Sequence, residues 1–215
     1  MGALRAKRRR EPRDNPAAEA VGRRGMMEAE RELMRRIREA CGREIEAATN
    51  GDLTRAALLA AITANESGGS GSAYRFEPLI YSRLQCLLQG EEQEVEGVKR
   101  EQIEKILRGV KSEFERAALL RKVAGRHGYT QIPGWCAVLW DAPLEDLTRK
   151  ATHFGLALRR LEELCNCFRL DPERDALDVG RAWSTGHPMG QTRSALYSWR
   201  LGLRRSLWEE MGSRA

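Results

Sequence analysis

The sequence predicts an all-α fold with about eight helices. Apolar residues recur at helical spacing along most of the 215 residues, whereas no stretch alternates with a period of two for long enough to predict a sheet. The composition, 41% hydrophobic and 32% charged, is typical of a globular protein, and the length suits one domain with a tail.

Composition divides the chain into three parts, which are residues 1–24, 25–50 and 51–211. The first part is rich in Arg, Pro, Gly and Ala without periodic apolar positions, so we expect a flexible basic arm. The second part predicts an N-terminal helix, and the third contains the main helical domain. The net charge of +6 favours anionic partners such as nucleic acid, anionic lipid or a cell-wall polymer, although the simplest role of the arm is a solubilising tail.

The first helices have clear boundary signals. Apolar positions predict a helix over 26–48, and Asp52 is placed to cap the Ala/Leu-rich helix over 53–65, the strongest helix signal in the chain. A Gly/Ser loop follows at 67–74. The same signals predict the remaining elements: a helix over 79–88, charged helical pieces over 91–124, a turn-rich segment over 125–134, a short apolar segment over 135–140, a helical turn over 143–147, and helices over 148–168, 171–182 and 191–211.

The five cysteines lack the C-x-x-C spacing and the paired histidines of a zinc site, so we expect no metal and no cofactor. Free, mostly buried thiols are typical of a chain made in a reducing cytoplasm. No apolar segment follows the N-terminal arginines as in a secretory signal, and no long apolar run predicts a transmembrane helix. These signals leave the final localisation open.

Glu66 is the candidate catalytic residue, because it lies at the last turn of the Ala/Leu-rich helix, immediately before Ser67 and Gly68. The negative end of the helix dipole and partial burial both favour the protonated form of a carboxyl group at this position. A protonated carboxyl near neutral pH is what a general acid for glycoside cleavage requires. The simpler interpretation is a solvated acid at a helix end.

Further segments follow Glu66-Ser67-Gly68 in order: Arg75-Phe76-Glu77-Pro78, Gly128-Tyr129-Thr130-Gln131-Ile132, Pro143–Leu147 with Arg159-Arg160-Leu161, and Ala182-Trp183-Ser184-Thr185-Gly186. In this order they resemble the lysozyme-like domain of bacterial soluble lytic transglycosylases, which is related to goose-type lysozyme. The resemblance covers residues 50–200. Its departures are Tyr129-Thr130 in place of Leu-Met, Trp183-Ser184 in place of Tyr-Asn, and a long charged insertion before Gly128.

The resemblance implies a glycosidase that cleaves the β-1,4 bond between N-acetylmuramic acid and N-acetylglucosamine in peptidoglycan. Glu66 would serve as the single acid and base and leave a 1,6-anhydro product. A lysozyme-type hydrolase would use a second carboxylate, for which Glu77 is the candidate. The implied partner is the peptidoglycan glycan strand, with no metal, cofactor or nucleic acid, and the oligomeric state is open. The candidate substrate-binding residues are Ser67, Tyr129, Gln131, Trp183 and Tyr197.

Two other functions fit the same sequence. A non-catalytic member of the same fold would bind the cell wall or organise an assembly, and the altered groove segments motivate this alternative. A basic helical nucleic-acid-binding protein would use the Arg-rich arm, with affinity for DNA that depends steeply on salt. The substrate of the enzyme alternative lies outside the cytoplasm, so that function requires phage-type release, a secretion apparatus or a different native start site.

Overall fold

The computed structural model describes residues 16–213, with side chains from residue 24 onward. This part of the chain is mostly helical, which confirms the all-α class at its coarsest level. None of the helices in this range is long and apolar enough to cross a membrane. The elements are α1 (Pro16–Ala48), α2 (Leu53–Ser67), β1 (Tyr74–Phe76), α3 (Pro78–Gln89), β2 (Glu94–Val95), β3 (Val98–Lys99), α4 (Arg100–Leu107), α5 (Glu113–Val123), β4 (Gly125–His127), β5 (Ile132–Pro133), α6 (Gly134–Leu139), η1 (Leu144–Leu147), α7 (Lys150–Phe168), α8 (Ala176–Thr185) and α9 (Tyr197–Gly212).

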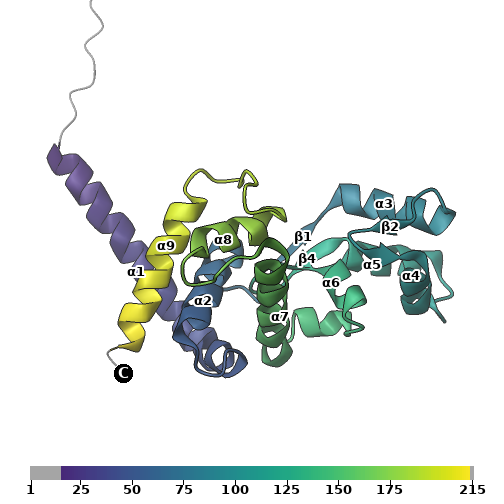
Figure 1. Ribbon diagram of the computed structural model, residues 1–215, viewed down its shortest axis with the longest axis horizontal. Helices are drawn as coiled ribbons and strands as arrows, with labels where there is room; N and C mark the ends of the chain where they lie inside the picture. The colour runs from purple at the N-terminus through teal and green to yellow at the C-terminus, as the bar shows by residue number, and fades with distance from the viewer. Residues whose placement is uncertain (1–15, 214–215) are drawn as a thin grey trace, which may run out of the picture.

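The helices form two groups along the long axis of the molecule (Figure 1). One group contains α1, α2, α8 and α9, and the other contains α3, α4, α5 and α6. The helix α7 and the strands β1 and β4 lie between the two groups, and α7 contacts α1, α2 and α8. The chain therefore leaves the first group through β1 and returns to it through α7.

The helix α2 contains the longest buried run of any single helix, because all residues from Ala56 to Ala64 are buried. Asp52 begins this helix as predicted, and its carboxylate accepts a hydrogen bond from the Arg55 amide at 3.0 Å. The helix continues slightly past its predicted end to Ser67, and Gly68 then takes a left-handed conformation with a φ of 64°. As a result, Glu66 lies in the last turn of α2, next to the chain reversal.

The helix α1 is longer and more closely packed than the sequence predicts. It begins at Pro16, so residues 16–24 of the predicted flexible arm are helical. The helix contacts α2, α7 and α9, and the predicted separate N-terminal helix is thus part of the common core. Residues 1–15 of the predicted arm lie outside the described residues. The side chains of α1 that are fully buried in this core are Met34, Ile37, Cys41 and Ile45.

Two small sheets correct the prediction of a purely helical chain. The strands β1, β4 and β5 form an antiparallel sheet in the order β1-β4-β5, and β2 pairs with β3. Every strand has only two or three residues, which is too short for a period-two pattern to be visible in the sequence. Arg75 of β1 pairs with Arg126 of β4, and Tyr74 pairs with His127. These partners are far apart in the chain, so no local signal indicates their pairing.

Some helix boundaries also differ from the prediction. Within the charged segment 91–124, which the sequence predicts as helical pieces broken at Gly97 and Gly109, the hairpin of β2 and β3 occupies residues 94–99. Its two central residues, Glu96 and Gly97, take left-handed conformations. The helices α8 and α9 begin at Ala176 and Tyr197, both later than the sequence predicts. The turn before α8 and the loop before α9 therefore lengthen the connections that lead to the candidate site.

All five cysteines carry free thiols. Cys41 and Cys136 are buried, Cys167 is exposed, and Cys86 and Cys165 are intermediate. Burial raises the pKa of the Cys41 thiol to about 11 and that of the Cys136 thiol to about 11. Both thiols therefore stay protonated near neutral pH, which makes them poor nucleophiles.

Candidate active site

Glu66 has a half-buried side chain in the last turn of α2. Its Oε1 accepts a hydrogen bond from the Tyr197 hydroxyl at 2.8 Å. Its other oxygen, Oε2, has no hydrogen bond from any of residues 24–213. One oxygen is therefore fixed by a neighbour, and the other is available for proton transfer.

Tyr197 is the first residue of α9 and is only 8% exposed. Its ring has no open face to stack on a sugar, so the structure gives it a different position from the substrate-binding one that the sequence predicts. Burial raises the pKa of the Tyr197 phenol well above its usual value, and the negative charge of Glu66 acts in the same direction. The phenol therefore stays protonated and remains a hydrogen-bond donor to Glu66.

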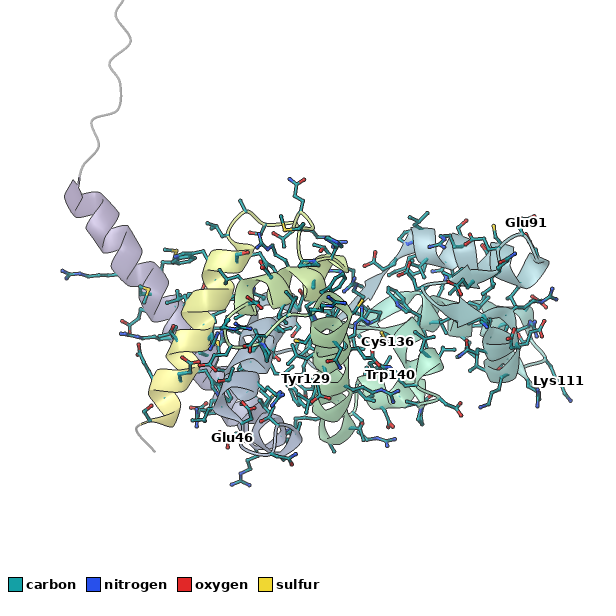
Figure 2. The ribbon with its side chains drawn as sticks, in the orientation of Figure 1. Glu46, Glu91, Lys111, Tyr129, Cys136 and Trp140 are labelled. Carbon is teal, nitrogen blue, oxygen red and sulfur yellow. The ribbon has the colours of Figure 1, made fainter. Side chains whose placement is uncertain are left out.

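Ser67 joins the end of α2 to the loop of residues 128–131. Its hydroxyl lies 2.5 Å from the Tyr129 carbonyl oxygen, to which it donates a hydrogen bond. The Tyr129 ring itself lies between α2 and α7 (Figure 2) and packs against Phe154, with ring centroids 5.3 Å apart. Two of the segments identified in the sequence thus meet at the end of α2. The Tyr129 ring, however, packs against the hydrophobic core.

The side chains of Gln131 and Trp183 are both buried and form hydrogen bonds to backbone carbonyl groups. The amide group of Gln131, which is 3% exposed, donates hydrogen bonds to the carbonyl oxygens of Ala73 at 3.0 Å and Gly128 at 3.1 Å. The indole N–H of Trp183, which is 4% exposed, donates to the Thr130 carbonyl oxygen at 2.8 Å. Both residues therefore hold the loop of residues 128–131 in place, Gln131 against the residue before β1 and Trp183 from α8. Neither offers the sugar contact that the sequence predicts for it.

His153 of α7 orders the same loop from the opposite side. Its Nε2 accepts hydrogen bonds from the Thr130 amide at 3.1 Å and the Thr130 hydroxyl at 2.9 Å. Its Nδ1–H donates to the Leu147 carbonyl oxygen at 2.7 Å. Burial lowers the pKa of His153 to about 4, so the ring is neutral and its tautomer is fixed near neutral pH.

Arg75 and Arg126 lie opposite each other on β1 and β4 and share the Glu77 carboxylate. The Nε atoms of Arg75 and Arg126 lie 2.9 Å and 3.4 Å from Glu77 Oε1. Burial and then the positive charge of Arg75 lower the pKa of Arg126, whereas Glu66 and Glu77 act to raise it. Glu77 is therefore shared by two arginines, which leaves one net positive charge in the cluster, and Arg126 lies within electrostatic range of Glu66.

No protein-family model, curated protein or solved structure matches this chain. Within residues 24–213, no three His, Cys, Asp or Glu side chains are grouped so that they could hold a metal ion. The functional interpretation consequently depends on the geometry around Glu66.

A hollow of about 500 Å³ lies on the other face of the three-stranded sheet. Successive strand residues point to opposite faces, so Tyr74 and His127 face the hollow while their neighbours Arg75 and Arg126 face away from it. Glu66 does not line the hollow. The complete lining is Tyr74, Phe76, Ala118, Arg121, Lys122, His127, Leu144, Glu145 and Thr148.

Proposed function

We propose that the protein is a lysozyme-like glycosidase that cleaves peptidoglycan, with Glu66 as its single acid and base. The observation that carries the proposal is the environment of the Glu66 carboxyl, which is half-buried at a helix end. One of its oxygens accepts a hydrogen bond from Tyr197, and the other has no hydrogen bond from the described residues. The meeting of the matched segments supports it. Hydrogen bonds join Ser67 to the 128–131 loop, and join that loop to Trp183.

In the proposed reaction, Glu66 first donates its proton to the glycosidic oxygen, and the bond from that oxygen to the anomeric carbon of N-acetylmuramic acid breaks. This leaves an oxocarbenium-like centre that needs a nucleophile. The Glu66 carboxylate then accepts the proton of the C6 hydroxyl of the same sugar, while the C6 oxygen bonds to the anomeric carbon. The product is a 1,6-anhydro sugar, and Glu66 is protonated again for the next cycle.

The state of Glu77 favours this route over hydrolysis. Lysozyme-type hydrolysis uses a second carboxylate as a base or nucleophile. The Glu77 carboxylate is already paired with both Arg75 and Arg126, so its charge is compensated by neighbours. Hydrolysis by Glu66 and Glu77 together is the second candidate, and the two routes differ in the mass of their products.

The proposal is tested by mass spectrometry of purified peptidoglycan after incubation with the protein. We expect anhydro-muropeptides, each lighter by one water than the product of hydrolysis. Replacing the acid in Glu66→Gln should lower the rate of product release by at least about a hundredfold, with an unchanged thermal unfolding transition. Glu94→Gln is the matched control, because Glu94 is exposed on β2 and should retain full activity.

Other outcomes identify the rival functions. Hydrated products would favour the two-carboxylate hydrolase. No product from the wild-type protein, or equal release by Glu66→Gln, would contradict the enzyme. A non-catalytic wall-binding protein would still sediment with peptidoglycan. A nucleic-acid-binding protein would instead bind DNA with a steep salt dependence that Glu66→Gln does not change.

A further inference from the structure

A buried ion pair joins α1 to α9 close to the end of α2. Glu30 of α1 and Arg204 of α9 are each 6% exposed, and Arg204 Nε donates to Glu30 Oε2 at 2.6 Å. Arg200 Nε lies 3.4 Å from the other oxygen of Glu30. A buried ion pair gains little stability over an apolar pair, but losing one partner is costly because the other charge is left uncompensated. The geometry of this pair is therefore closely constrained.

The same arginine links the ion pair to the end of α2. Arg204 Nη1 donates to Asn65 Oδ1 at 2.5 Å, and the Asn65 amide group donates to the Tyr197 carbonyl oxygen at 3.1 Å. The Tyr197 hydroxyl in turn donates to Glu66 at 2.8 Å. These contacts form a continuous path from α1 through α9 and α2 to the Glu66 carboxyl.

The first turn of α9 depends on this path. The first N–H groups of a helix have no partner within it, and α9 begins at Tyr197 without a side-chain cap, so contacts with other helices help to hold this turn in place. The Asn65 contact ties this turn to α2, and the Arg204 contact fixes the orientation of Asn65. These contacts to the backbone of α9 thereby determine where the Tyr197 hydroxyl lies relative to Glu66.

We propose that Glu30, Arg204 and Asn65 are positioning residues that hold the Tyr197 hydroxyl against Glu66, and that they make α1 part of the active site. The catalytic consequence depends on the proposed function. The positioning itself is a property of the unliganded protein and is measured without substrate.

The first test measures steady-state kinetics on soluble glycan strands. Glu30→Gln/Arg204→Gln removes both charges of the buried pair together. Arg200 loses its Glu30 contact in this variant, but its side chain is 40% exposed, so no fully buried charge is left unpaired. We expect kcat to fall by about tenfold or more, because a small misplacement of a catalytic group is costly, while KM changes by less than about twofold. Arg31→Gln/Glu210→Gln is the control, since this exposed pair joins the same two helices at 4.0 Å and should change neither value.

A second variant separates positioning from folding. Asn65→Ser keeps the Glu30–Arg204 pair and removes the link to Tyr197, so its circular dichroism should match that of the wild-type protein. We expect the same selective fall in kcat. A normal kcat in both Asn65→Ser and the folded double variant would overturn the inference while leaving the proposed function intact.

The substrate-free readout is the NMR titration of the tyrosine ring carbons, with Tyr197→Phe used to assign the Tyr197 signal. We expect the pKa of Tyr197 to lie well above its usual range in the wild-type protein, because burial and Glu66 both raise it. In both positioning variants we expect the titration of Tyr197 to shift from the wild-type position. The exposed control pair should leave the titration unchanged. If the wild-type protein cleaves no glycan, the proposed function fails, and a Tyr197 titration that these variants do not alter would separately overturn the positioning.

Discussion

The proton positions around Glu66 and His153 are set by their hydrogen-bond partners. Tyr197 donates to one Glu66 oxygen, and the other oxygen is the one that would exchange a proton in the proposed reaction. The Thr130 amide can only donate, so Nε2 of His153 must be the unprotonated nitrogen and Nδ1 must carry the hydrogen. The proposed role of Glu66 requires proton exchange, whereas the surroundings of His153 keep its ring neutral.

His153 should make the stability of the protein depend on pH. Its pKa is about 4 in the folded protein and 6.5 in an unfolded chain, so the unfolded chain binds more protons between these values. Its contribution is complete above pH 6.5 and is lost as the pH falls toward 4. At 1.36 kcal/mol per pKa unit, this loss is on the order of 3 kcal/mol.

Urea unfolding at a series of pH values measures this loss. We expect His153→Gln to be less stable at neutral pH and to have a flatter pH profile than the wild-type protein. Burial also lowers the pKa of His127, so some slope should remain in the variant. An identical slope in both proteins would show that His153 is not the group responsible.

At the scale of elements, α2 is the best predicted part of the fold. Its Ala/Leu-rich composition, the Asp52 cap and the glycine at its end are local signals, and each one acts in the structure as expected. The three-stranded sheet had no such signal, because its strands are short and their partners are distant in the chain. The pairing of Arg75 with Arg126, and hence the engagement of Glu77 by both, could not be predicted for the same reason.

The N-terminal caps of α2 and α5 differ in hydrogen-bond length, and this difference predicts how much each cap contributes to stability. Asp52 receives the Arg55 amide at 3.0 Å and also pairs with the Arg55 guanidinium at 2.5 Å, whereas Ser112 receives the Glu115 amide at 3.5 Å. We expect Asp52→Ala to lower the free energy of unfolding by about 1 kcal/mol. Ser112→Ala should lower it by less, and equal losses in urea titrations of the two variants would contradict this ranking.

At the scale of the whole molecule, the first and last helices both contribute residues to the candidate site. Glu30 belongs to α1 and Tyr197 to α9, and both act on the end of α2. The sequence identified Glu66, Ser67 and the 128–131 loop as neighbours through the order of its motifs. It did not indicate Asn65 or the buried ion pair, since polar residues within amphipathic helices resemble ordinary surface positions until the packing is known.

Removing α1 should therefore unfold the protein. Its four fully buried apolar side chains contribute about 2 kcal/mol each, which approaches the total stability of a typical domain. We expect residues 51–211 alone to lack a cooperative thermal transition by calorimetry. A chain that begins at Pro16 retains every described contact and is the control. A cooperative transition of residues 51–211 at the full-length temperature would show that α1 is dispensable.

The distribution of the thiols gives the protein a built-in reporter. Cys167 is exposed at the end of α7, whereas Cys41 on α1 and Cys136 on α6 are shielded in the two different helix groups. An alkylating dye added to the folded protein will thus modify Cys167 first, and the shielded pair will react only as each region opens. Peptide mapping of the modified sulfurs over time would show which half of the molecule loosens earlier.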